Sequence, residues 1–353
     1  MTNKNVKFVS ETDIVFDGMF WIDNNGVKHR YVDPLLDEGF KILFGSEGNE
    51  DLLIDLLNKV LPGAEIRDLK YCNTEHHGMT ESEGNAIFDV YCEDVDGVRF
   101  LVEMQNWSQQ YFNKRAIYYS TFAIQDQAAK EKRHQLKTLG KDKWDYNFAP
   151  VYLVCFLTFN MKRSLPNLTK VKEDDYISIY KYTDVETNEL LGDGTTLIFI
   201  EMKKFCKSLK ECSSEKERWI CSLKSMGEQL EMPQELSGTI LQTMYDKAAL
   251  AAMPLEKRIN YISKTMSRND ELNSRAEMIE EALQEGYAKG LDEGLAEGVI
   301  KGREEGRAEG REEGRSEGRA DTAQKMLASG MSLEQVADIL QMTATEMETF
   351  LAF

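Results

Sequence analysis

The sequence lacks the marks of several protein classes. Its six cysteines form no C-x-x-C pair, and its first residues contain no apolar stretch typical of a secretory signal. The longest apolar run, residues 149–159, is too short to span a bilayer. A phosphate-binding loop, a dinucleotide fingerprint, a nucleophile elbow and a kinase signature are all missing. We therefore expect a cytoplasmic protein with reduced cysteines and no membrane segment.

Positive charge is also scarce. The 353 residues include 43 Lys and Arg against 61 Asp and Glu, which gives a net charge of −18 and excludes binding to DNA through bulk charge alone. Contact with DNA would need local basic segments, and two are present, interleaved with aromatic residues. Their cations are Lys114, Arg115, Lys130, Lys132, Arg133, Lys137, Lys141 and Lys143, then Lys162, Arg163, Lys170 and Lys172. The alternative interpretation is that these cations solvate a helix.

Periodicity predicts an α/β fold for the first part of the chain. Helices and β-rich segments alternate there, which is typical of this class. We expect two helices within residues 33–61, the first capped by Asp33 with Pro34 at its first position, and the second capped by Asn49. The predicted strands are 86–93, 98–105, 150–159 and 195–202, and a long helix is predicted at 108–133. The apolar strand 150–159 should be covered on both faces.

The chain divides by composition into five parts. The predicted parts are an N-terminal arm (1–32), an α/β domain (33–212), a helical subdomain (213–283), a charged glycine-repeat helix (284–320) and a small helical tail (321–353). In the tail, Ser332 and Gln335 fit a capping box, and the segment 333–342 resembles the core of a helix-turn-helix. Small helical hairpins without DNA contacts share this pattern.

Glycine recurs at every fourth residue from Gly286 to Gly318. In a helix each of these nine glycines costs about 1 kcal/mol relative to alanine. The repeat is therefore either a fraying, solvated helix or a helix that is supported by a partner, since a glycine stripe permits close approach of a second helix. The second interpretation predicts a homo-oligomer.

Two acidic residues on the predicted hairpin are candidate metal ligands. Glu103 and Gln105 alternate onto one face of their strand, and Asp89 joins them if the register is right. A three-residue turn with a left-handed Gly97 pairs Asp94 with Val98 and places Asp89 opposite Glu103. A two-residue turn would move Asp89 to the other face. We predict the first register.

Converging carboxylates suit phosphodiester hydrolysis. Mg²⁺ takes carboxylate oxygens, activates water and relieves charge on a phosphate. The alternative is that Asp89 and Glu103 simply face solvent on a half-exposed hairpin. A rival site is Glu201-Met202-Lys203 with Asp193, although Asp193 lies too close in sequence to belong to a paired strand. The adjacent pair His76-His77 is weak evidence for zinc.

The order of these motifs resembles the Rpn-type recombination-promoting nucleases, also described as PD-(D/E)XK family transposases. The similarity covers roughly residues 30–265. The glycine repeat and the helical tail that follow are similar to C-terminal features of the same group. The resemblance is carried by four stretches taken together, which are 33–45 with 51–58, Phe88-Asp89-Val90, Val102-Glu103-Met104-Gln105, and 112–120.

The resemblance implies a restriction-endonuclease-like core with a C-terminal all-helical extension, so that residues 33–212 form the nuclease-like domain. It implies an endodeoxyribonuclease that depends on Mg²⁺ (or Mn²⁺) and takes part in bacterial DNA rearrangement. Asp89 and Glu103 then match the metal ligands, and Gln105 stands where the family motif has lysine. Lys41 or Arg115 would supply the missing charge. The alternative is a weak or inactive nuclease fold that binds DNA or self-assembles.

Overall fold

The computed structural model describes residues 15–17, 19–76, 86–107, 111–138, 144–161, 175–192, 194–343 and 347. The chain forms two compact units, residues 1–269 and 270–353. Within the described residues, every helix is either too short or too polar to span a bilayer.

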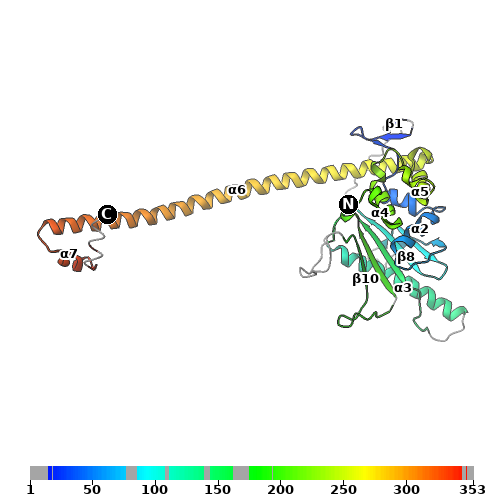
Figure 1. The fold of residues 1–353 in the computed structure, drawn as a ribbon, viewed down its shortest axis with the longest axis horizontal. Helices are drawn as coiled ribbons and strands as arrows, with labels where there is room; N and C mark the ends of the chain where they lie inside the picture. The colour runs from blue at the N-terminus through cyan, green and yellow to red at the C-terminus, as the bar shows by residue number, and fades with distance from the viewer. Residues whose placement is uncertain are drawn as a thin grey trace, which may run out of the picture. The chain divides into compact units, whose positions relative to one another are not determined.

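A six-stranded sheet forms the centre of the first unit (Figure 1). Its strands in spatial order are β10 (Ile177–Lys181), β11 (Thr195–Glu201), β9 (Val151–Leu157), β8 (Arg99–Gln105), β7 (Val90–Asp94) and β4 (Leu69–Tyr71). The central strands β8, β9 and β11 run parallel, and β7, β4 and β10 add antiparallel edges. The predicted α/β class is confirmed, and all of β9 except Tyr152 is buried, as expected for a strand covered on both faces.

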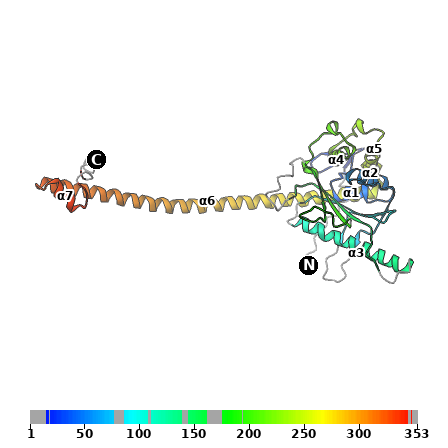
Figure 2. The same cartoon turned by 60° about the horizontal axis from the view of Figure 1, so that its bottom comes forward.

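Helices cover both faces of this sheet (Figure 2). The helix α3 (Phe112–Thr138) packs on the face formed by Leu101, Leu153 and Phe199. The opposite face, which carries Val102, is covered by helices from the N-terminal and C-terminal parts of the unit's sequence. These are α1 (Asp37–Phe44), α2 (Glu50–Val60), α4 (Glu215–Ser225), α5 (Ile240–Ala248) and the first turns of α6 (Leu255–Ala328). The helical segment after residue 213 therefore shares one core with α1 and α2.

The first helix begins later than predicted. α1 starts at Asp37 with Leu36 at the N-cap, so the prediction of Asp33 as cap and Pro34 as first helical residue was wrong. The side chain of Asp33 instead accepts a hydrogen bond from the amide of Leu35 (2.8 Å) and holds a turn. Asn49 occupies the N-cap position of α2 as predicted, but its side chain makes no capping hydrogen bond and instead donates to the carbonyl of Ile42 (2.9 Å).

The segment 1–32 was predicted to be a loose arm, and where the structure describes it this was wrong. The strands β1 (Val15–Asp17), β2 (Phe20–Ile22) and β3 (Lys28–His29) form an antiparallel sheet. Trp21 and Tyr31 are buried in the core of the first unit. The chain then runs beside the end of α5, where the Val32 amide bonds to the Ala248 carbonyl (2.9 Å).

A second small sheet pairs β5 (Glu75–His76) with β6 (Ala86–Ile87). His77 lies outside the described residues, so the histidine pair is not tested there.

The second unit consists of α6 from Asp270 onward and α7 (Leu333–Ile339). The glycine repeat is helical throughout, and the predicted boundaries at 283/284 and 320/321 both fall inside α6. At the tail, Ser332 and Gln335 form the predicted capping box, and a small core joins Ala323, Val336, Ala337 and Met347. The predicted helix after Thr343 lies mostly outside the described residues.

Candidate active site

The register of the β7–β8 hairpin brings the two candidate acids to one face of the sheet. Val90 is paired with Val102, and the amide of Asp94 bonds to the carbonyl of Val98 (3.0 Å). Gly97 has a φ of +81°, the left-handed conformation that this turn requires. The predicted first register is confirmed, and it places Asp89 opposite Glu103.

The predicted strand 86–93 is interrupted at Phe88 and Asp89, which was not foreseen. The Asp89 carboxylate accepts a hydrogen bond from the Met104 amide (2.9 Å), and the Asp89 amide donates to Oε1 of Glu103 (3.3 Å). The amides of Asp89 and Met104 therefore bond to carboxylate oxygens here, where a continuous strand would give them backbone carbonyls. The break in the strand is what holds both carboxylates against each other at the end of β8.

Burial makes this acid pair resist ionisation. Glu103 is buried, with only 3% of its surface exposed. Burial, with the neighbouring charge of Asp89 as the second cause, raises the pKa of Glu103 to about 8. Burial also raises the pKa of Asp89, although the hydrogen bond from Met104 and the charge of Lys41 oppose this. A cation bound between the two acids would remove the conflict.

Lys41 reaches this pair from α1. Its Nζ lies 3.1 Å from Oδ1 of Asp89. Burial, the largest single influence, acts to lower the pKa of Lys41, but the charge and hydrogen bond of Asp89, together with the charges of Asp37 and Glu38, outweigh it and the pKa is raised. The structure therefore places the ammonium group in its charged form beside one candidate metal ligand.

Gln105 and Arg115 complete the surroundings of Glu103. Nε2 of Gln105 donates to Oε2 of Glu103 (3.0 Å), so the amide fixes the orientation of the carboxylate. The guanidinium of Arg115, on α3, stacks over the ring of Tyr119 at 4.8 Å. Its charge acts to lower the pKa of Glu103. The structure thus brings Lys41, Asp89, Glu103 and Gln105 into direct contact, and the charge of Arg115 acts on Glu103.

One residue near this site was missed. Asp37 lies four residues before Lys41 on α1, hence on the same helix face. Its charge raises the pKa of both Lys41 and Asp89, and its Oδ1 accepts a hydrogen bond from Asn106 (3.1 Å). The spacing of Asp37 and Lys41 was the available signal.

The donor set at the hairpin fits a hard divalent cation. The two carboxylates offer oxygen ligands, which Mg²⁺ prefers, and Mg²⁺ keeps several waters of its own. In the part of the chain that the structure describes, no cluster of three or more His, Cys, Asp or Glu could hold a metal. A cation here would therefore rest on Asp89, Glu103 and water.

The rival Glu201-Met202-Lys203 motif has a structural explanation. Glu201 is fully buried at the end of β11 and accepts a hydrogen bond from the Met161 amide (2.7 Å). Its ion pair is with Lys204 (2.9 Å), while Lys203 is exposed. Asp193 lies outside the described residues. The motif's lysine is thus not the partner of its glutamate.

The predicted basic segments are described only in part. Lys130 forms an ion pair with Glu93, and Lys114 lies over the ring of Tyr111 at 5.5 Å. Lys132 lies over the ring of Trp144 at 5.9 Å. The cations outside the described residues are Lys141, Lys143, Lys162, Arg163, Lys170 and Lys172.

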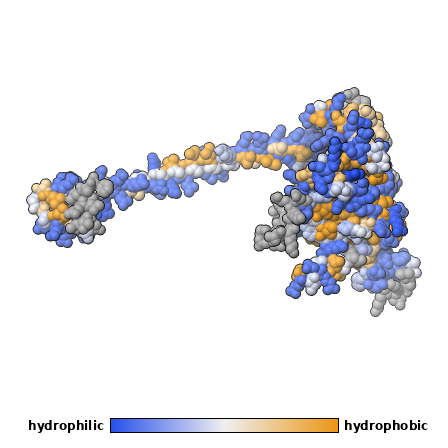
Figure 3. Space-filling view, in the orientation of Figure 1, coloured by the Kyte–Doolittle hydropathy of each residue, from blue (hydrophilic) through white to orange (hydrophobic). Residues whose placement is uncertain are grey.

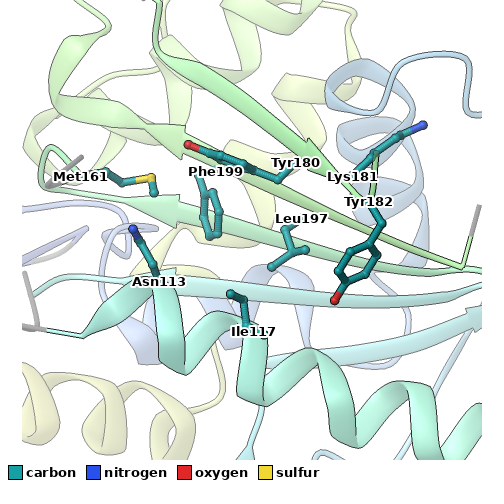
Figure 4. A pocket seen from close by; sticks show the side chains of 8 residues that line it. All are labelled: Asn113, Ile117, Met161, Tyr180, Lys181, Tyr182, Leu197 and Phe199. Carbon is teal, nitrogen blue, oxygen red and sulfur yellow. The ribbon is translucent and has the colours of Figure 1, made fainter. Parts of the chain in front are cut away.

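A pocket of about 300 Å³ opens between α3 and the β10–β11 edge of the sheet (Figure 4). It lies on the face of the sheet that carries Glu103, because Phe199 is level with Glu103 two strands away. The lining is mainly apolar and aromatic: Asn113, Ile117, Met161, Tyr180, Lys181, Tyr182, Leu197 and Phe199.

Comparison with known proteins gives a family match. A family model described as PD-(D/E)XK nuclease family transposase matches residues 34–278, which is more than half of the chain. No curated protein and no solved structure matches. The match includes α1, the β7–β8 hairpin and α3, and so contains every residue of the candidate site.

Proposed function

Because the chain belongs to the PD-(D/E)XK nuclease family transposases, we propose that it is a metal-dependent DNA endonuclease that acts in DNA rearrangement. The observation that carries this proposal is the buried pair formed by Asp89 and Glu103, held by hydrogen bonds at the end of β8. A fold gains little from burying two like charges side by side. Their placement is explained if they bind Mg²⁺ or Mn²⁺.

Each site residue then has a separate task. Asp89 and Glu103 hold the metal, which when bound supplies charge relief at the phosphate and lowers the pKa of a water. Gln105 donates to Glu103 through its amide nitrogen and leaves its own oxygen to orient the attacking water. Since an amide carries no charge, Lys41 provides the positive charge that the family motif places on a lysine at this position.

The test of this function is plasmid nicking. Supercoiled DNA should be converted to the open circle with Mg²⁺ or Mn²⁺, and the activity should disappear with a chelator and in Asp89→Asn. If nicking persists in Asp89→Asn, the proposed site is wrong. DNA retention on a gel without any nicking would instead support an inactive nuclease fold that binds DNA. That alternative arises because Gln105, which carries no charge, stands where the family motif has a lysine.

Lys41→Met should lower nicking by about 10- to 100-fold, the range typical of groups that support metal ligands. The variant keeps most of the side chain's volume and removes the charge that faces Asp89. The matched control is Lys59→Met, because Lys59 pairs with Asp55 on α2 in a similar exposed ion pair. Equal activity in both variants, measured as initial nicking rates, would remove Lys41 from the mechanism.

DNA is the proposed substrate, and the surface around α3 is the proposed contact. Lys114 and Tyr118 are exposed on its first turns, and Tyr111 is exposed just before the helix begins. Lysine and arginine contact phosphates without reading sequence. This arrangement suits an enzyme with little base preference.

A further inference from the structure

Apolar side chains reach the surface of the first unit in several places, among hydrophilic ones (Figure 3). One such place is the pocket between α3 and the β10–β11 edge, which contains none of the residues proposed for the metal site. Ile117 on one wall and Tyr182 on the other are about half exposed, so a ligand can reach it. An apolar hollow of about 300 Å³ with a few polar groups is typical of a small-ligand site.

Aromatic rings form the walls of this pocket (Figure 4). Tyr180 pairs with Leu197, so both side chains point to the face of the sheet that α3 covers, and Tyr182, two residues further along, points the same way. The ring of Phe199 meets that of Tyr180 edge-to-face at 5.5 Å. In Figure 4 the rings of Phe199 and Tyr182 lie on either side of Leu197. A flat, aromatic ligand suits this arrangement, because it can lie against the rings.

The polar groups of the pocket fit a nucleobase. Asn113 contributes an amide, which offers both a donor and an acceptor, as the edge of a base does. Among the described residues that line the pocket none is acidic, although the chain as a whole has a net charge of −18. Lys181 is basic, and its ammonium group points away from the other lining side chains in Figure 4. The lining therefore suits a base whose phosphate stays outside the pocket.

Positive charge follows both sides of the pocket in the sequence. Asn113 is followed by Lys114, which is exposed, and by Arg115. Met161 is followed by Lys162, the first cation of the second basic segment. Cations that bind phosphates, combined with aromatic rings that bind bases, are typical of proteins that hold unpaired DNA. A DNA strand is thus a better occupant than an apolar peptide, which would gain nothing from the cations.

The pocket lies within reach of a strand that passes the metal site. Phe199 is level with Glu103, two strands away in the same sheet. Neighbouring strands are about 4.8 Å apart, so the two positions are separated by about 10 Å. A DNA strand rises about 3.4 Å per nucleotide in a duplex, so about three nucleotides cover this distance. A base in the pocket and a phosphate at the metal site can therefore belong to one strand.

We propose that the pocket binds one unpaired base of the strand that is cut, within about three nucleotides of the scissile phosphate. This rests on the proposed nuclease function and adds a substrate class to it, namely DNA with a bulged, mismatched or frayed base. A base in an intact duplex must first lose its stacking and pairing, whereas a bulged base has already lost its partner. The chain should therefore select DNA at such defects without reading a sequence.

Binding of defined duplexes to the full chain tests the pocket without any cleavage. Glu103→Gln protein is titrated into labelled DNA that carries one bulged adenine, one bulged abasic nucleotide or no bulge, and fluorescence anisotropy is measured. The bulged adenine should bind at least about tenfold more tightly than the abasic bulge, as expected for one base stacked on aromatic side chains. Equal affinities for the two bulges would overturn the proposal.

Two neighbouring residues of β10 give a matched pair of variants. Tyr180 and Ile179 are both 43% exposed, but they point to opposite faces of the edge strand, and of the two only Tyr180 lines the pocket. Tyr180→Ala should bring the affinity for the bulged adenine close to that for the abasic bulge, and Tyr180→Phe, which keeps the ring, should restore it. Ile179→Ala should keep the full difference. If Tyr180→Ala keeps it too, or if both alanine variants lose it, the base does not lie in this pocket.

Mapping of the cuts made by the native chain with Mg²⁺ separates this proposal from the nuclease function. Cuts in the bulged duplex should cluster within about three nucleotides of the adenine. Cuts spread evenly along the strand would contradict the proposed position of the base. A native chain that prefers the bulged adenine and cuts no DNA would refute the nuclease function and still support the pocket.

Discussion

Glu103→Gln is expected to reduce nicking by roughly 1000-fold and to leave the free energy of unfolding unchanged or higher. Loss of a metal ligand removes several kcal/mol of transition-state stabilisation, and about 1.4 kcal/mol corresponds to a factor of ten in rate. The fold does not need the charge, because burial already favours the neutral form of this side chain. Glutamine is close in shape and is neutral at every pH.

The matched control for this variant is Glu201→Gln. Glu201 is another fully buried acid at the same end of the sheet, but it is paired with Lys204. Its substitution leaves a cation in a buried pair without its partner, so stability should fall while nicking remains. Nicking rates and denaturant unfolding of both variants give the comparison. A Glu103→Gln enzyme that still cuts DNA would exclude Glu103 as a ligand.

The second large effect is on the pH dependence of stability in metal-free protein. Burial, with the charge of Asp89 second, raises the pKa of Glu103 from 4.5 to about 8, so the native state keeps a proton that the unfolded chain has already lost. Stability from this group is fully present below pH 4.5 and is lost as pH rises through about 8. The raised pKa of Asp89 acts in the same direction. The loss should be on the order of a few kcal/mol.

Denaturant unfolding from pH 5 to 8.5, with and without Mg²⁺, measures this effect. Metal binding needs the ionised carboxylates, so added Mg²⁺ should stabilise the protein more at pH 8 than at pH 5. Glu103→Gln should flatten the profile and reduce the response to Mg²⁺. Parallel pH profiles for the native chain and this variant would mean that Glu103 ionises normally.

The hairpin could be predicted because its turn chemistry is local. A left-handed glycine at 97 sets the strand register, and the register determines which side chains share a face. Asp89 and Glu103 were therefore found from residue types and spacing alone. Lys41 was named only through the family resemblance, since its contact with Asp89 joins elements far apart in the sequence.

The errors arose where tertiary contacts override local pattern. The strand break at Asp89 depends on a hydrogen bond from the amide of Met104. Met104 lies on another strand, so the pattern of residues 86–93 alone could not predict the break. The sheet of β1, β2 and β3 is short and irregular in pattern, and its strands are stabilised by burial of Trp21 in the core of the first unit. The turn residues Asp23-Asn-Asn-Gly26 were the local signal for a hairpin there, and in the structure Gly26 has a φ of +78°.

The sheet of β1, β2 and β3 also shows that the family match and the folding unit do not coincide. The match begins at residue 34, whereas Tyr31 packs edge-to-face on Tyr245 (5.1 Å) and Val32 bonds to the end of α5. A shortened chain beginning at Pro34 would leave Tyr245 and the neighbouring apolar surface of α5 open to water. Such a protein would tend to aggregate, and a negative result obtained with it would report on solubility and not on catalysis.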